Sequence, residues 1–311
     1  MEADGPNDRI ALEADAPNGE AFSPTEAVPT PRTVEDQPTR ADRIFDLITT
    51  TSAAVVLALL GLIALFLVLR SRPAFQAMGL SFFTETKWNT SSNPPQFGVL
   101  ALLTGTITVA LVAVVIAVPL GVCAALFIND YAPPRLRRFL GSVVDLLAAI
   151  PSILYGLWGL FYLGAQIAPL SAFLARHFGW IPIFGTEKNA NFAGSMFVAG
   201  IVVSLMVLPI VAAVSREVFA RTPPGEKEAA LALGGTRWGM IRTVVLPYGR
   251  GGIIGGSMLG LGRALGETMA VVLILPQVPL LTTRLLQNGG ATIAGFIAAR
   301  RGGSDLSVSG L

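Results

Sequence analysis

Long apolar runs separated by short polar stretches fill the chain from about residue 44 onward. Five of these runs reach the roughly 20 residues that an α-helix needs to cross a bilayer. They are Phe45–Leu69, Phe97–Ile128, Phe139–Ala165, Phe192–Val214 and Gly252–Leu275. The pattern therefore predicts an all-α integral membrane protein with five clear transmembrane helices.

A proline inside such a run removes a helical hydrogen bond and bends or breaks a helix. Pro119 predicts a bend in the second run and Pro151 a kink in the third. A shorter run, Ala291–Ala299, is too brief to span and is expected to be re-entrant or interfacial. The residues from Leu306 resemble the start of a sixth helix, so we expect the last transmembrane helix to be truncated.

The composition is that of a membrane protein, with 52% hydrophobic and 14% charged residues among 311. The first forty residues hold nine acids and three bases, so residues 1–43 are predicted to be a disordered, acidic, cytoplasmic tail. Residues 44–311 form the predicted transmembrane domain. With the N-terminus inside, eleven lysines and arginines lie on the inner side and eight on the outer side. This bias favours a multi-pass protein of the cell (inner or plasma) membrane with a cytoplasmic N-terminus.

Residues that support catalysis or metal binding are scarce. Cys123 is the single cysteine, which excludes an intrachain disulfide, and it is expected to be a small core residue. His177 is the single histidine, which excludes a multi-histidine metal site. An intramembrane enzyme would need a nucleophile–base pair or metal ligands at membrane depth, and His177 falls in an outer loop. We therefore predict no catalytic residue and no metal site.

The fifth run carries two charges, Arg263 and Glu267, in an otherwise apolar segment. A charge near the bilayer centre costs about 2.5–3.5 kcal/mol on insertion scales, so it marks a transport pathway or a paired structural site. In a continuous helix these two side chains would share a face and pair. Gly252, Gly256 and Gly260 form a neighbouring stripe at which another helix can pack closely. An ion pair that only fixes helix packing is the alternative interpretation.

Residues 215–251 form the longest predicted inner connection. Thr222 and Pro223 suit the start of a short helix, as N-cap and first helical residue. Glycine at 234 suits a left-handed helix end. A second amphipathic piece is expected over residues 236–246, stopped by Pro247. By composition alone, this connection is a solvated helical hairpin.

The order of residues within this connection is more specific. Glu228, Ala229 and Ala230 are followed after three residues by Gly234 and after nine more by the sequence VVLP. This order resembles the EAA motif of ABC importer permeases, in which Val244 takes the place of an isoleucine. The resemblance implies a type I ABC importer permease fold, in which this loop is a cytoplasmic coupling helix that docks into an ATPase subunit.

Further stretches resemble one subfamily of these permeases, the PstC type of the phosphate-specific ABC transporter. They are FGVLALLTGTITVALVAVVIAVPLG, YAPPRLRRFL, AAIPSILYGLWGLF, LGLGRALGETMAV and NGGATIAGFIA. The resemblance covers about Trp88–Ala298 and leaves out the acidic tail. It implies a transmembrane subunit of an ATP-driven importer of inorganic phosphate, which forms half of the translocation pathway.

The resemblance also implies partners. A PstA-like second permease subunit, a PstB-like ATPase dimer and a PstS-like phosphate-binding protein are expected, together with membrane lipid and without nucleic acid. The chain has no G-x-x-x-x-G-K-[ST] loop, so ATP and Mg would be bound by the partner ATPase and no cofactor by this chain.

The resemblance implies that Arg263 and Glu267 are required for phosphate passage. Arginine offers paired planar donors to an oxyanion, so we predict that Arg263 makes a transient anion contact. Glu267 would hold the arginine until the anion arrives. Ser152 and Tyr155 could line the path, although packing is the commoner role. The alternative functions are a permease for another oxyanion, such as sulfate or molybdate, and a non-transport membrane scaffold.

Overall fold

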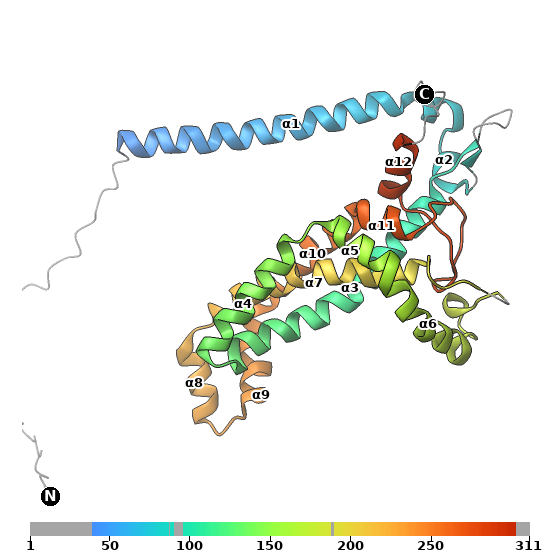
Figure 1. Ribbon diagram of the computed structural model, residues 1–311. Coiled ribbons are helices and arrows are strands. Elements are labelled where there is room, and N and C mark those ends of the chain that lie inside the picture. Colours follow the sequence, from blue (N-terminus) through green and yellow to red (C-terminus); the bar gives the residue numbers. More distant parts are fainter. Residues whose placement is uncertain (1–38, 87, 90–95, 188–189, 303–311) are drawn as a thin grey trace, which may run out of the picture. The chain divides into compact units, whose positions relative to one another are not determined.

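The structure is a computed structural model that describes residues 39–302 except 87, 90–95, 188 and 189 (Figure 1). It divides into two units, Met1–Phe66 and Leu67–Leu311, and each is described by itself. The sixth helix predicted from Leu306, and residues 1–38 of the predicted acidic tail, lie outside the described residues.

Among the residues that the structure describes, four helical segments are long and apolar enough to cross a membrane. They are Arg40–Gln76, Leu100–Tyr131, Ser152–Phe178 and Met196–Ala220. The first segment is α1 (Arg40–Met78), and the fourth is α7 (Met196–Ala220). The second consists of α3 (Leu100–Leu126) and the π-helical turn η1 (Phe127–Tyr131). The third consists of α5 (Ser152–Trp158), the π-helical turn η2 (Gly159–Leu163) and α6 (Gly164–Phe178). The prediction of an all-helical membrane protein is confirmed. The first unit contains α1 as far as Phe66.

The third apolar run, Phe139–Ala165, does not form one kinked helix, and that prediction was wrong. Its first part belongs to α4 (Pro134–Ala149), which is a separate helix. The residue before a proline is driven out of the helical region by the proline ring. Ile150, which precedes Pro151, accordingly has an extended ψ of 129°, and the spanning helix starts only at Ser152.

The fifth run, Gly252–Leu275, is also interrupted, so the prediction of a single helix there was wrong. α10 (Leu246–Gly266) ends where Glu267 takes an extended conformation, with φ −67° and ψ 125°, and α11 (Met269–Ile274) follows. The Glu267 carboxylate accepts a hydrogen bond from the Ala270 N–H at 3.3 Å. A carboxylate in this position stabilises the start of a new helix rather than the continuation of the old one.

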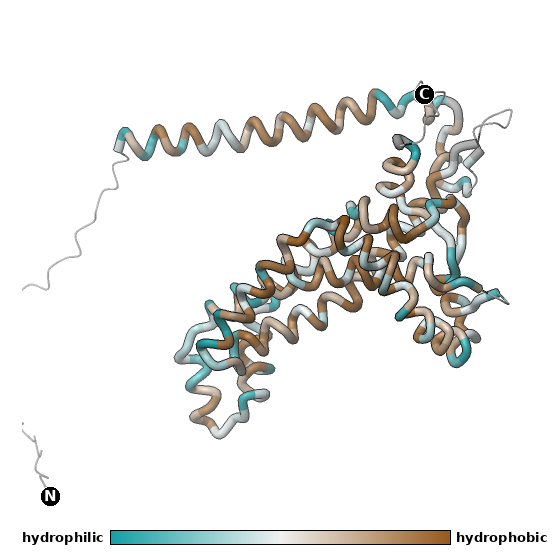
Figure 2. Tube along the Cα trace, viewed as in Figure 1, coloured by the Kyte–Doolittle hydropathy of each residue, from teal (hydrophilic) through white to brown (hydrophobic). Residues whose placement is uncertain are grey.

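The core of the second unit lies where α3, α7 and α10 run side by side (Figure 1). Glycines permit the close approach of α3 and α7. A Cβ on Gly121 of α3 would lie 3.0 Å from the Val211 side chain, and one on Gly200 of α7 would lie 2.5 Å from that of Val112. Hydrophobic residues predominate along these helices, and hydrophilic residues are concentrated near the helix ends (Figure 2).

The two ends of α7 carry different structures. Its C-terminal end leads into α8 (Pro224–Ala232), α9 (Arg237–Met240) and the π-helical turn η4 (Ile241–Val245), which joins α10. Near its N-terminal end lie α2 (Ser81–Thr84), the antiparallel pair β1 (Trp88–Asn89) and β2 (Gln96–Phe97), η3 (Pro182–Phe184) and α12 (Ile293–Gly302).

The short run predicted over Ala291–Ala299 largely forms α12. Phe296 in this helix is 4% exposed and meets the Trp88 ring edge-on, with centroids 5.1 Å apart. Its re-entrant or interfacial placement stays a prediction. Cys123 was expected in the core, but it is exposed, because it lies on the face of α3 that points away from the buried alanines.

Candidate functional site

Arg263 lies in the last turn of α10, near the point where the helix breaks. Its side chain is half-buried, and its Nε is buried without a hydrogen-bond partner among the described residues. An unpaired buried donor costs about 1–3 kcal/mol, and more when the group is charged. The Arg263 guanidinium therefore has a buried N–H donor that is available to a hydrogen-bond acceptor.

Glu267 is 8% exposed and follows directly after α10. Because the helix ends before it, the predicted common face of Arg263 and Glu267 does not exist. The described residues include no ion pair between the two side chains within 4.0 Å. The predicted pairing was therefore wrong, and the carboxylate instead bonds to the start of α11.

Tyr155 on α5 is half-buried and carries a phenolic hydroxyl. The same hydroxyl donates a hydrogen bond to the Leu147 carbonyl at 3.1 Å, across the break between α4 and α5. Ser152, one turn earlier, is half-buried. α5 packs tightly on α11, since a Cβ on Gly156 would lie 2.7 Å from the Ala270 Cα. The packing of α5 on α11 thus brings the helix that carries Tyr155 to the break between α10 and α11, where Glu267 lies.

The three glycines of the α10 stripe face valines of α7. A Cβ on Gly252 would lie 2.7 Å from Val218 Cβ, one on Gly256 3.2 Å from Val214 Cβ, and one on Gly260 2.6 Å from Val207 Cγ1. Real Cβ atoms do not approach closer than about 3 Å, so the helices are closer than larger residues would permit. This spacing sets the position of Arg263 against α7.

We expect Gly252→Ala to destabilise the protein by about 1–3 kcal/mol, the usual cost of forcing an extra methyl group into a packed contact. Gly251→Ala is the matched control, because a Cβ there meets nothing within 4 Å. Alanine in that open helical position should be neutral or stabilising by up to about 1 kcal/mol. Thermal unfolding of the detergent-purified variants measures both. Equal melting temperatures for the two would contradict the close contact.

The residues of the EAA-like motif lie on α8 and just after it. α8 contains no buried residue, and Glu228 and Ala229 are exposed while Ala230 is half-buried. Gly234 has φ +84°, a left-handed conformation that glycine adopts without strain. Leu233, beside it, is 91% exposed.

Two details of this segment differ from the prediction. Thr222 is 4% exposed and its hydroxyl makes no hydrogen bond to a described residue, so it does not cap α8; Pro223 holds the N-cap position. Pro247 does not stop the second piece. It is the second residue of α10, and η4 and α10 follow each other without a break.

An ion pair that the sequence did not suggest ties α8 to the end of α3. Lys227 Nζ lies 2.7 Å from Asp130 Oδ1 in η1, and their side chains are 20% and 5% exposed. Asn129 donates to the other Asp130 oxygen at 3.2 Å. Arg137 of α4 donates to backbone carbonyls of η1, including that of Ile128 at 3.1 Å. Ninety-seven residues separate Lys227 from Asp130, so no local pattern could reveal the contact.

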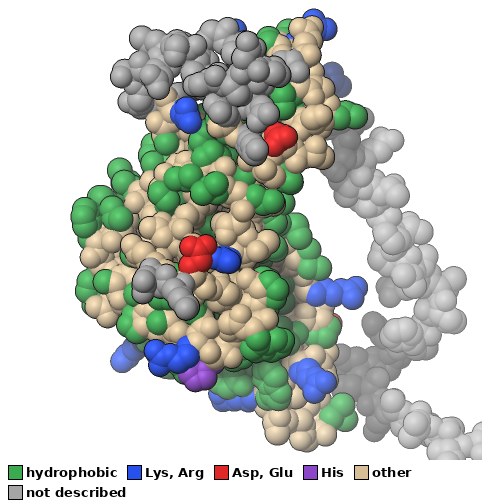
Figure 3. Space-filling view, turned by 90° about the vertical axis from the view of Figure 1, so that its right-hand side faces the viewer, with side chains coloured by type: hydrophobic (Ala, Val, Ile, Leu, Met, Phe, Trp, Pro, Cys, Tyr) green, Lys and Arg blue, Asp and Glu red, His purple; other side chains and the backbone are tan. Residues whose placement is uncertain are grey.

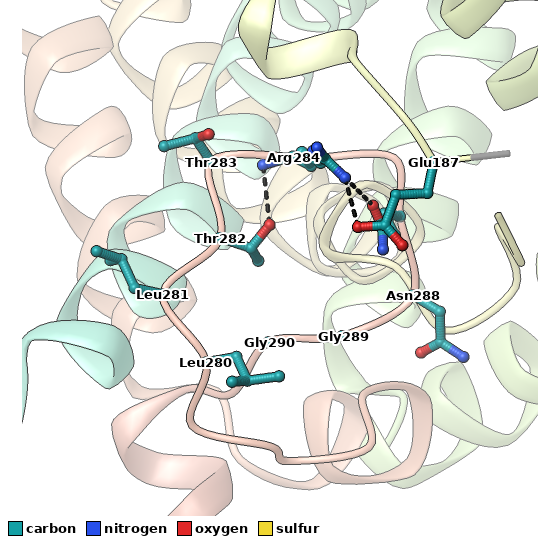
Figure 4. Close-up of a pocket in the computed structure, with 10 residues that line it drawn as sticks. Glu187, Leu280, Leu281, Thr282, Thr283, Arg284, Asn288, Gly289 and Gly290 are labelled. Atoms are coloured by element: carbon teal, nitrogen blue, oxygen red, sulfur yellow. Dashed lines mark hydrogen bonds and ion pairs between the residues drawn. The ribbon is translucent and has the colours of Figure 1, made fainter. Parts of the chain in front are cut away.

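A cavity of about 330 Å³ lies near the opposite end of α7 (Figure 4). We call it the Arg284 pocket; its lining residues are Glu187, residues 280–284 and residues 287–290. Arg284 Nη1 donates to Glu187 Oε1 at 2.6 Å and to Gln287 Oε1 at 3.2 Å. Figure 3 shows a face of the molecule on which charged side chains are sparse, with an acidic and a basic side chain next to each other near its middle.

Residues 117–300 match the family of binding-protein-dependent transport system inner membrane components. The match covers more than half of the chain and includes α4 to α11 and the α8–α9 hairpin. The fold and site therefore define a permease component of a binding-protein-dependent transporter, as distinct from the ATPase of such a system.

Relatives narrow this assignment. The phosphate transport system permease protein PstC 2 of Mycobacterium tuberculosis is 46% identical over 263 residues, which are 84% of this chain and 81% of the relative. The PstC protein of Xylella fastidiosa is 44% identical over 83% of this chain and 80% of its own length. The chain belongs to the PstC family of phosphate transport system permeases.

A solved structure of an amino acid ABC transporter aligns with 53% of this chain and 68% of its own, at 21% identity. Its TM-score of 0.32 is too low to support an argument about this chain.

Proposed function

We propose that this chain is a transmembrane subunit of an ATP-driven importer of inorganic phosphate and forms half of the translocation pathway. Membership of the PstC family supports the substrate. The observation that carries the mechanism is Arg263, a half-buried cation whose Nε has no partner among the described residues, at the junction of three helices. Planar guanidinium donors match the oxygens of a phosphate ion.

In this mechanism Arg263 contacts the anion during passage. Glu267 does not hold Arg263 by an ion pair, as the sequence predicted, because its carboxylate bonds to the start of α11. It fixes the turn between α10 and α11 and so places Arg263, and its negative charge prevents the anion from resting there. Tyr155 and Ser152 supply neutral hydroxyls on the α5 side of the same junction.

The exposed hairpin of α8 and α9 supports a coupling role for Glu228, Ala229, Ala230 and Gly234. The hairpin docks onto a PstB-like ATPase dimer, which binds ATP and Mg. A PstA-like permease subunit completes the path and a PstS-like protein delivers phosphate. The surrounding lipid covers the apolar helices. This chain then needs no cofactor of its own.

This assignment places the α8–α9 hairpin and the N-terminus on the cytoplasmic side of the cell membrane. It also implies a type I importer fold, in which α10 and α11 together make the fifth crossing. Residues 1–43 are the cytoplasmic tail and residues 44–311 the permease domain in this proposal.

Reconstitution of the chain with its candidate partners into liposomes tests the function. We expect ATP-dependent phosphate uptake that requires the binding protein and is not reduced by excess sulfate or molybdate. Inhibition by either of those ions would favour the alternative oxyanion, and the absence of any uptake by an assembled complex would favour a scaffold.

A further inference from the structure

We propose that the Arg284 pocket is a phosphate acceptance site, at which Arg284 exchanges Glu187 for the incoming anion before the anion reaches Arg263. The inference rests on the proposed function and adds a second anion contact to it. Three observations support it: the position of the pocket, the fixed backbone of its loop, and the exposed ion pair between Arg284 and Glu187.

The position of the pocket suits entry from the side opposite the ATPase. Its loop pairs with the start of α7 through the bridge between Asn288 and Ser195, and Phe197 N–H donates to the Leu285 carbonyl at 3.1 Å. The hairpin that contains α8 follows the other end of this 25-residue helix. At 1.5 Å per residue the two ends are about 37 Å apart, which is the thickness of a membrane.

The pocket lies nearer than Arg263 to the N-terminal end of α7. Gly260 of α10 faces Val207, and the pocket loop meets α7 twelve residues earlier, at Ser195. That separation is about 18 Å along the helix axis. Arg263 is almost one turn beyond Gly260 in the direction of the pocket, because α10 runs antiparallel to α7. Arg263 and the pocket loop are therefore about 14 Å apart along the axis of α7, and both lie in the half of α7 away from the α8–α9 hairpin.

The loop that carries Arg284 is held firmly. Leu285 and Leu286, the next two residues, are 6% and 0% exposed. Backbone hydrogen bonds join Leu285 to Ile183 at 2.9 Å and Asn288 to Asn191 at 2.8 Å. The Arg284 N–H donates to the Thr282 hydroxyl at 3.1 Å. A guanidinium on a fixed backbone is ordered in advance, so it loses little freedom when it binds an anion.

The present partner of Arg284 is exchangeable. Glu187 comes from a different connection and is 66% exposed, and the Arg284 side chain is 41% exposed. An ion pair with such exposure contributes about 0–1 kcal/mol, so little is lost when a phosphate oxygen takes the place of the carboxylate. Thr282, Thr283 and Asn288 line the same cavity, and the Thr282 hydroxyl, which points inside the loop, offers a neutral donor to a further phosphate oxygen (Figure 4).

Opposite effects of two substitutions distinguish this role from a simple link between two loops. In the complete reconstituted complex, Arg284→Gln is expected to lower phosphate uptake about tenfold, as for loss of one charge-assisted contact. ATP hydrolysis stimulated by the binding protein stays unchanged. Glu187→Gln frees the arginine and leaves uptake equal or higher. Arg176→Gln removes an exposed charge from the last turn of α6, outside the pocket, and is the matched control with unchanged uptake.

Two results would overturn the inference. Equal losses of uptake and of thermal stability in Arg284→Gln and Glu187→Gln would mean that the ion pair only links the loops. Weaker binding of the phosphate-loaded binding protein to the Arg284→Gln complex, measured without ATP, would assign the surface to protein docking instead. Failure of the proposed function has a separate sign, because the unsubstituted complex would then transport no phosphate at all.

Discussion

Arg263→Ala is expected to reduce phosphate uptake by at least about 30-fold in an assembled complex. Removing one partner from a desolvated charge contact costs about 2–5 kcal/mol, and 2 kcal/mol already corresponds to that factor. The half-buried side chain and the unpaired Nε of Arg263 make it the cation that an anion would meet at the junction of α5, α10 and α11. Initial rates of labelled phosphate uptake into proteoliposomes measure the effect.

Two further variants separate charge from geometry. Arg263→Lys keeps the charge but loses the planar fork of donors, so uptake should recover only in part. Arg250→Ala removes an exposed arginine from the same helix and serves as the matched control, with uptake unchanged. Normal uptake by an Arg263→Ala complex that contains all its subunits would refute the anion contact.

The second large effect is expected at the ion pair between Asp130 and Lys227. Asp130→Asn leaves a mostly buried lysine without its counter-charge, which costs about 3–5 kcal/mol in a fully buried site and somewhat less here. The α8–η1 contact then loosens, and movement of the hairpin no longer reaches α3. We expect the phosphate transported per ATP hydrolysed to fall about tenfold, within the usual range of coupling energies between sites. Parallel assays of uptake and ATP hydrolysis give this ratio.

Exchange of the two charges provides the decisive comparison. The double variant Asp130→Lys with Lys227→Asp should recover part of the ratio, since it restores an ion pair between the same elements. Glu217→Gln breaks the ion pair between Glu217 and Arg221, whose side chains are 67% and 71% exposed, respectively. It should leave the phosphate transported per ATP unchanged. If Asp130→Asn transports as much phosphate per ATP as the unsubstituted complex, the pair has no part in coupling.

The limits of sequence pattern are visible in the two charged residues of the fifth run. The apolar run around Arg263 and Glu267 was visible, but periodicity assumes a continuous helix. α10 ends before Glu267, whose carboxylate bonds to the start of α11. The four-residue spacing from Arg263 therefore predicted a shared helix face that the structure does not have. A carboxylate competing for backbone N–H groups is a local interaction, yet its outcome depends on how α11 packs against α5.

The sequence by itself determined the membrane class, the first, second and fourth of the spanning helices, and the family. These features depend on hydrophobic length and on motifs of adjacent residues, which are local properties of the chain. The tertiary structure alone decided that Asp130 meets Lys227 and that Glu187 and Arg284 border one cavity. Each of these contacts joins residues 97 positions apart, which only the packing of the whole chain brings together.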